Sequence, residues 1–98
     1  MEIKVSDIAT EDLIRGYNFY ESQEAGVGDY FLDSLWSSID SLVLYYGIQE
    51  IFHRKYYRML STTFPYAIYY TYDSDTIYVA SVQDVRRKPA FNSTRLES

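Results

Sequence analysis

FPYAIYY, at residues 64–70, leads through a polar turn into TIYVASVQDVRRKP, at residues 76–89. From Phe64 onward, aromatic or β-branched side chains recur at every second position, which is the period of a β-strand. Asp73 and Asp75 frame the turn with side chains that can bond their own backbone. The pattern predicts an antiparallel β-hairpin. In its second strand we expect one face formed by Ile77, Val79 and Ser81 and another formed by Tyr78, Ala80 and Val82.

Before the hairpin, the apolar period lengthens to that of two amphipathic helices. The first carries Glu11 and Arg15 at a spacing that predicts an ion pair. The glycines of EAGVG permit a tight reversal, after which the second helix is predicted over residues 28–46, with Gly47 following its last turn. The apolar stripes are Ala9, Leu13, Tyr17 and Tyr20 in the first helix, and Phe31, Leu35, Ile39, Leu42 and Tyr46 in the second.

The remaining segments predict a sheet for these helices to cover. Residues 2–5 alternate as an edge strand would. Residues 55–60, 64–72 and 76–83 are expected to pair as consecutive antiparallel strands, because hairpin-length connections favour that arrangement. The predicted fold is therefore α+β and two-layered, with an N-terminal antiparallel helical hairpin packed on a mainly antiparallel β-sheet. We expect one domain over residues 1–98.

The composition narrows the class of protein. The chain has 98 residues, 47% of them hydrophobic and 23% charged, which is ordinary for a globular domain. It has no cysteine, so the sequence carries neither a disulfide framework nor a Cys-ligated metal site. No apolar run approaches the roughly 20 residues of a transmembrane helix. We expect a cytoplasmic protein without a membrane partner.

Charge is divided unevenly along the chain. Residues 1–50 carry ten acidic and two basic residues, a sum of −8, whereas residues 51–98 carry four acidic and seven basic residues, a sum of +3. Because an anionic partner responds to local potential, the C-terminal half can meet a phosphate backbone while the N-terminal half repels it. The pI near 4.6 argues against a nonspecific nucleic-acid binder.

Four cations and two tyrosines are the candidate binding residues. The cations can offer forked donors to a phosphate or a carboxylate if the strands bring them together, or they can be solvated charges opposite the acidic helices. The tyrosines can stack on a partner, but a half-buried sheet also recruits tyrosine for packing. The candidates are Arg58, Tyr69, Tyr78, Arg86, Arg87 and Lys88.

No metal or cofactor is expected. His53 is the only histidine, so a histidine-centred metal site or nucleophilic relay would rest on one residue, and we expect it at the surface. Asp73 and Asp75 could be read as ligands, but two aspartates between strands are ordinary turn chemistry. The sequence contains no glycine-rich phosphate loop.

Four segments, in this order, resemble the RelE/ParE superfamily, which includes plasmid stabilisation proteins. They are FYESQEAGVGDYF, YYRML, FPYAIYY and DVRRKP. The resemblance implies the toxin component of a type II toxin–antitoxin module, with a cognate antitoxin as its partner. It also implies that Arg58, Arg86 and Arg87 contact the target or the antitoxin.

Departures from the family pattern separate three functions. Ribonucleases of the superfamily commonly carry an arginine where this chain has Ala67, and an acting tyrosine where it has Phe91 and Asn92. Phosphodiester cleavage needs charge stabilisation and proton transfer, which these residues do not supply. The resemblance thus favours a ParE-like poison of DNA gyrase without chemistry of its own, or a member that has lost toxicity. The alternatives are a ribosome-dependent mRNA endonuclease in which Arg58 and Arg86 clamp the phosphate, and an inert antitoxin-binding module.

Overall fold

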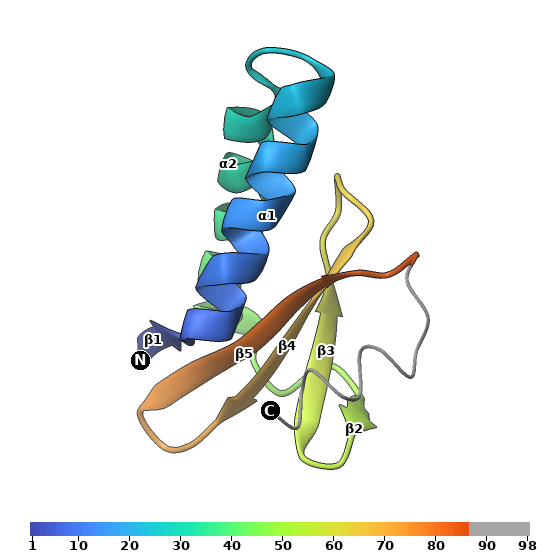
Figure 1. Cartoon of the computed structure of the whole chain (residues 1–98). Coiled ribbons are helices and arrows are strands. Elements are labelled where there is room, and N and C mark those ends of the chain that lie inside the picture. Colours follow the sequence, from blue (N-terminus) through green and yellow to red (C-terminus); the bar gives the residue numbers. More distant parts are fainter. Residues whose placement is uncertain (87–98) are drawn as a thin grey trace.

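The computed structural model describes residues 1–86, which form two helices and five strands (Figure 1). In chain order the elements are β1 (Glu2–Val5), α1 (Asp7–Gln23), α2 (Val27–Tyr45), β2 (Ile51–His53), β3 (Tyr56–Leu60), β4 (Tyr66–Tyr72) and β5 (Thr76–Asp84).

All five strands form one sheet in the order β1-β5-β4-β3-β2. The pairs among β2, β3, β4 and β5 are antiparallel, and β1 lies parallel to β5 at one edge. This arrangement confirms the predicted two-layer α+β fold. Strand β2 was not predicted, and β4 begins at Tyr66, two residues later than the alternation suggested.

Local chemistry fixes the ends of the helices. Ser6 caps α1, since its Oγ accepts a hydrogen bond from the N–H of Ala9 at 3.0 Å. In the turn between the helices, the Glu21 carboxylate accepts from the N–H groups of Gly26 and Gly28, at 3.1 and 2.9 Å. Gly47 follows the cap of α2 with φ of +83°, the left-handed conformation expected at that position.

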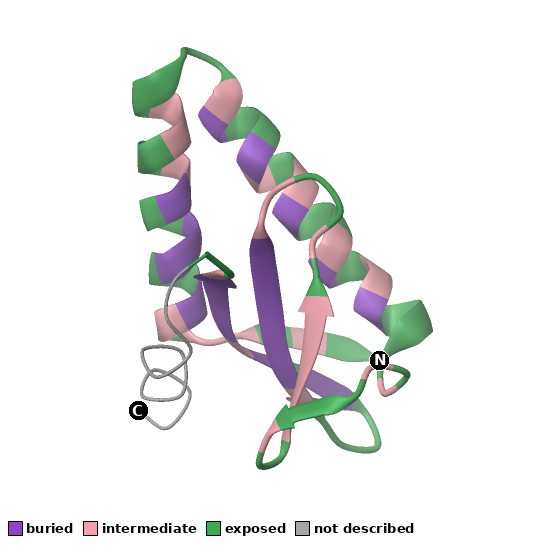
Figure 2. Cartoon of the chain, turned by 90° about the vertical axis from the view of Figure 1, so that its right-hand side faces the viewer, coloured by how far each residue is buried: buried purple, intermediate pink, exposed green. Residues whose placement is uncertain are grey.

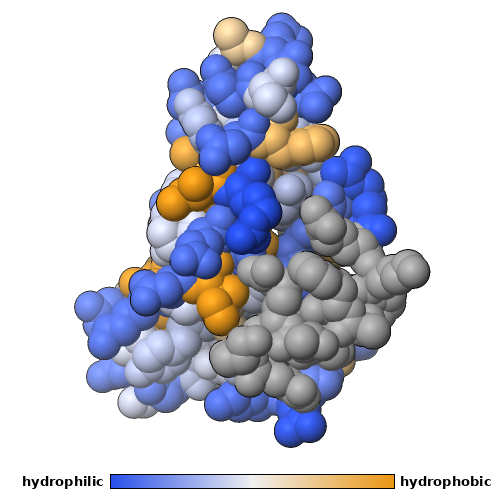
Figure 3. All heavy atoms as spheres, viewed as in Figure 1, coloured by the Kyte–Doolittle hydropathy of each residue, from blue (hydrophilic) through white to orange (hydrophobic). Residues whose placement is uncertain are grey.

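The helices cover one face of the sheet, here called the helix face; the opposite side is the far face. The helices pack side by side, α1 lies on β5, and Figure 2 shows the buried residues on their inner sides and along β4 and β5. On the side shown in Figure 3, the helical layer presents mainly hydrophilic residues. The helix-face core contains Ala9, Leu13, Phe31, Leu35, Ile39, Leu42, Tyr66, Ile68, Tyr70, Ile77, Val79 and Val82.

A bulge in β5 overturns the predicted alternation after Ala80. Tyr70 pairs with Val79 but the preceding Tyr69 pairs with Ser81, so Ala80 is an extra residue opposite β4. The insertion turns Val82 back to the helix face, whereas simple alternation placed it on the other side. Strict period-two counting cannot detect such an extra residue.

Asp12 of α1 explains why the bulge is stable. Its carboxylate is 5% exposed, and one oxygen accepts from the hydroxyl of Ser81 and from the N–H of Val82, each at 3.0 Å. The other oxygen lies 3.3 Å from Arg15 Nη1, so Arg15 pairs with Asp12 and the expected pair with Glu11 was wrong. A buried carboxylate thus satisfies donors that the bulge frees from the strand ladder.

Two further features of the helical layer are the end of α2 and the hydropathy of both helices. Tyr46, expected in the core stripe, is the C-cap of α2 and is 37% exposed, with its ring against Tyr72 at 4.8 Å. Neither helix formed by residues 1–86 is long and apolar enough to span a bilayer.

Candidate functional site

The outer edge of β3 is open where β2 stops. The paired residues of β2 face only Tyr56 and Tyr57, so among the described residues the edge from Arg58 to Leu60 has no strand beside it. The N–H of Ser61 donates to Tyr66 on the β4 side. Because backbone groups alternate in direction along a strand, the N–H and C=O groups of Leu60 point to the open side. This edge can accept another strand.

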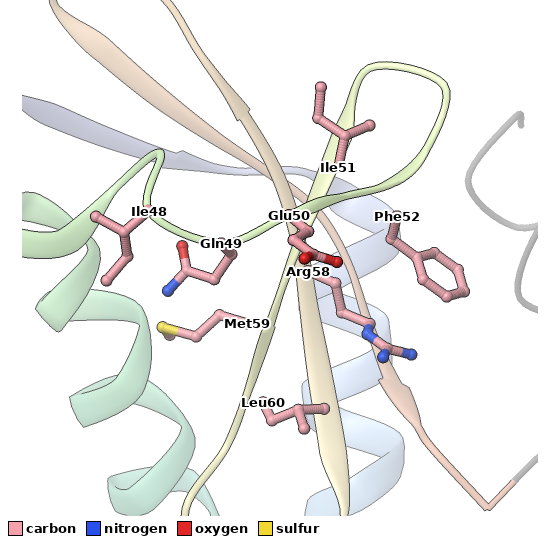
Figure 4. Close-up of a pocket in the computed structure, with 8 residues that line it drawn as sticks. All are labelled: Ile48, Gln49, Glu50, Ile51, Phe52, Arg58, Met59 and Leu60. Atoms are coloured by element: carbon pink, nitrogen blue, oxygen red, sulfur yellow. The ribbon is translucent and has the colours of Figure 1, made fainter.

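A hollow of about 640 Å³ lies along this edge (Figure 4). Its walls combine exposed apolar side chains with one acid and one base. Ile48 is 72% exposed and Leu60 is 57% exposed, so the hollow presents apolar surface to solvent. The lining residues are Ile48, Gln49, Glu50, Ile51, Phe52, Arg58, Met59 and Leu60.

Arg58 is the predicted binding residue that lies in the hollow. Its guanidinium carbon is 4.4 Å from the centroid of the Phe52 ring, and its backbone pairs with Tyr69 of β4. Stacking over an aromatic ring orients the guanidinium while the N–H groups at its rim remain able to bind a carboxylate or a phosphate. Arg58 therefore adds a positioned anion-binding group to an apolar surface.

The two candidate tyrosines lie on the far face but differ in exposure. Tyr69 is fully buried with Ala67 in a small second core, its ring 5.4 Å from that of Phe52, so it is not available for stacking on a partner. Tyr78 is 40% exposed, and its hydroxyl donates to Asp73 Oδ2 at 3.1 Å. For Tyr69 the packing interpretation holds.

Arg86 lies away from the hollow. Its Nε and Nη2 donate to the Asp84 carboxylate at 2.9 and 2.6 Å, and that carboxylate raises the pKa of Arg86 further above its usual value. Tyr20 and Tyr66, both packed in the helix-face layer, also raise the pKa of Arg86. Arg58 and Arg86 thus do not converge on one position. The predicted residues Arg87 and Lys88, with Phe91 and Asn92, lie outside the described part of the chain.

The residues considered as metal ligands, Asp73, Asp75 and His53, lie in a turn and at the end of a strand. Asp73 Oδ1 accepts hydrogen bonds from the N–H groups of Asp75 and Thr76, at 3.1 and 2.9 Å. Both bonds lower the pKa of Asp73, and the bond from Asp75 has the larger effect. The turn interpretation is confirmed. His53 ends β2 and is half-buried. Within residues 1–86, no three His, Cys, Asp or Glu side chains are grouped as metal ligands would be.

Most residues of the hollow were not predicted from the sequence. Strand β2 has three residues, too few for a periodic pattern to be recognised, and Ile48 and Ile51 stand on either side of polar residues. The signal that could have indicated the hollow is the presence of Ile48 and Ile51 just after Gly47, where the helix ends and no amphipathic pattern follows.

The fold has a counterpart among solved structures. No protein-family model matches the chain, and no curated protein matches it in sequence. A chain of the structure described as "Chromosomal ParDE TA system from P. aeruginosa" superposes with a TM-score of 0.78 at 15% sequence identity, covering 87% of this chain and 96% of that chain. At this identity the similarity is one of fold, and it confirms the RelE/ParE-like architecture predicted from the four sequence segments.

Proposed function

We propose that this chain is the toxin of a type II toxin–antitoxin pair. The observation that carries the proposal is the fold similarity, which extends over 96% of a chain from a ParDE toxin–antitoxin system. The open edge of β3 supports it, because such a toxin needs a surface on which an antitoxin can hold it.

The antitoxin binds at the hollow by adding an extended segment to β3. Backbone groups of Leu60 supply strand contacts, and the exposed Ile48 and Leu60 accept apolar side chains. An acidic residue in the segment pairs with the guanidinium that Phe52 orients. The partner segment is therefore extended, apolar at alternate positions, and acidic where it passes Arg58.

The toxin acts by binding its target, and a ParE-like action on DNA gyrase fits the residues best. Ala67 is fully buried on the far face, and Arg86 is held by Asp84 on the other side of the sheet from Arg58. A clamp on a scissile phosphate would need both arginines at one place. This arrangement supports a non-catalytic toxin over an endonuclease.

The edge can be tested with two substitutions at one position. The chain is co-expressed with the product of the adjacent reading frame, and affinity is measured by titration calorimetry on the separated proteins. Leu60→Ala removes the apolar side chain, whereas Leu60→Pro also removes the outward N–H without disturbing the pairing with β4. We expect Leu60→Pro to weaken binding at least tenfold more than Leu60→Ala. Equal effects would show that no strand adds at this edge, and absence of any complex would remove the antitoxin proposal.

The action of the toxin is tested by inducing the chain alone in bacteria. Stalled replication with DNA damage is the expected result. Site-specific cleavage of ribosome-bound mRNA that Arg58→Ala abolishes would instead establish an endonuclease. Unimpaired growth with a folded, antitoxin-binding protein would identify an inert interaction module.

A further inference from the structure

The outer side of α2, turned away from both the core and β3, carries six exposed residues in one sector. At about 100° per residue these six positions fall within roughly 100° around the helix axis. All of them are exposed, whereas the core residues of α2 lie on the other side. We call this set the outer stripe; it contains Asp29, Asp33, Trp36, Asp40, Val43 and Leu44.

The outer stripe combines three acidic and three apolar side chains. Trp36 and Val43 stand seven residues apart, as do Asp33 and Asp40, so each pair is separated by about 10.5 Å along the helix. Trp36 and Val43 are each 40% exposed and Leu44 is 77% exposed. Seven residues are about two turns of a helix, so the apolar pair and the acidic pair each lie along the axis on the outer side of α2, where a second helix can run beside them.

The charge around the outer stripe is strongly negative. Residues 7–45 hold eight acids and Arg15 as their one base, and Arg15 pairs with Asp12. Within residues 1–86, none of the three stripe aspartates forms an ion pair. The field extends to Tyr17, whose pKa is raised first by Glu21 and then by Asp29.

These features select among possible occupants. A nucleic acid would bring phosphates against carboxylates, and a second copy of the chain would bring the same three aspartates against its own. A helix with lysines or arginines beside an apolar seam satisfies both the charge and the spacing. We propose that the outer stripe docks a basic amphipathic helix of a partner protein, at a surface separate from the β3 edge.

Trp36 provides the measurement, because it is the only tryptophan in the chain. The probe is a 21-residue helical peptide with leucines at the seam of a heptad pattern and lysines beside them. Its matched control has glutamates in place of the lysines. Added to the full chain at low ionic strength, the lysine peptide should shift Trp36 emission to shorter wavelength in a saturable manner, and the glutamate peptide should not. Raising the salt should weaken the interaction.

Variants separate this surface from general attraction between opposite charges. Asp33→Lys with Asp40→Lys should weaken binding of the lysine peptide at least tenfold. The control, Glu2→Lys with Glu24→Lys, changes the net charge equally at exposed positions outside the stripe and should weaken binding less than threefold. If the first pair fails to fold, as judged by circular dichroism, Asp33→Asn with Asp40→Asn replaces it. Val43→Ser should weaken binding without changing its salt dependence.

Three results would overturn the proposal. The first is an unchanged Trp36 spectrum at saturating peptide. The second is equal weakening by the stripe variant and its control, which would mean that only net charge matters. The third is a concentration-dependent blue shift of Trp36 in the protein alone with self-association in sedimentation experiments, which would make a second copy the occupant. None of these outcomes depends on whether the antitoxin binds at β3.

Discussion

The sheet has a covered half, formed by β1, β5 and β4, and an edge half, formed by β3 and β2. In the covered half, five consecutive residues of β4 and six of the nine in β5 are buried, and α1 lies directly on β5. In the edge half, β3 is half-buried and β2 is largely exposed. The difference separates two tasks: one half of the sheet holds the fold together, and the other remains available to a partner.

The strands at the two edges show the same division. On the covered side the chain leaves β1 through Ser6, whose N–H donates to Val79 and whose hydroxyl donates to Ala80, at 3.0 and 2.8 Å. On the other side β2 pairs irregularly over three residues and leaves part of β3 open. The edge strand β1 is thus held to its neighbour along its whole length, whereas the edge strand β2 covers only part of its neighbour.

Matched leucine truncations should show the division most strongly. Leu35 is fully buried on the inner side of α2, and Leu35→Ala should lower the free energy of unfolding by about 2–5 kcal/mol through lost burial and the cavity left behind. Leu60→Ala in the edge half should change it by less than about 0.5 kcal/mol. Urea denaturation measures both. Similar losses would mean that the edge half is part of the cooperative core.

Removing the carboxylate at the β5 bulge should have the next largest effect. Asp12→Ala leaves the Ser81 hydroxyl and the Val82 N–H without their acceptor, which should destabilise the protein by about 1–3 kcal/mol. Arg15→Ala is the control, because the Arg15 side chain is 62% exposed and its pair with Asp12 should contribute less than about 1 kcal/mol. If the two variants matched, the ion pair and not the bulge would account for the role of Asp12.

In the edge half, binding should respond where stability does not. Arg58→Ala should weaken the antitoxin complex about tenfold, or roughly 1.4 kcal/mol, and reduce its salt dependence. Arg86→Ala should weaken it less than threefold, because Asp84 already occupies that guanidinium. Titrations at two ionic strengths test both. A larger effect at Arg86 would move the binding surface to the end of β5.

The smallest effect concerns pH. Burial, more than any other cause, raises the pKa of Tyr70 above its usual value of 10.0. The unfolded chain therefore loses this proton at lower pH than the folded protein, so stability should fall as the pH rises above about 10. Tyr70→Phe should make the unfolding free energy less dependent on pH in this range, although the N–H of Gly47 then loses its acceptor. An unchanged slope would assign the alkaline loss to other groups.

Sequence periodicity predicted the elements whose faces are continuous. The stripe through Phe31, Leu35 and Ile39 marks the core because a helix repeats its inward positions without interruption. The bulge at Ala80 and the three-residue β2 were not predictable. An inserted residue interrupts the two-residue period of a strand, and three residues are too few to show that period. Nor does the order of residues reveal that Asp84 reaches Arg86, because that contact depends on how the chain turns after β5.

The parallel pairing of β1 with β5 has a consequence for biosynthesis. Of the described strands, β1 leaves the ribosome before all others and β5 after all others, yet the two pair, with Glu2 opposite Thr76 and Val5 opposite Val79. Until β5 emerges, the helical hairpin can form locally, but α1 lacks the strand on which it lies. The described fold is therefore completed only when β5 has been synthesised, and the apolar stripes of the helices stay accessible to other proteins until then.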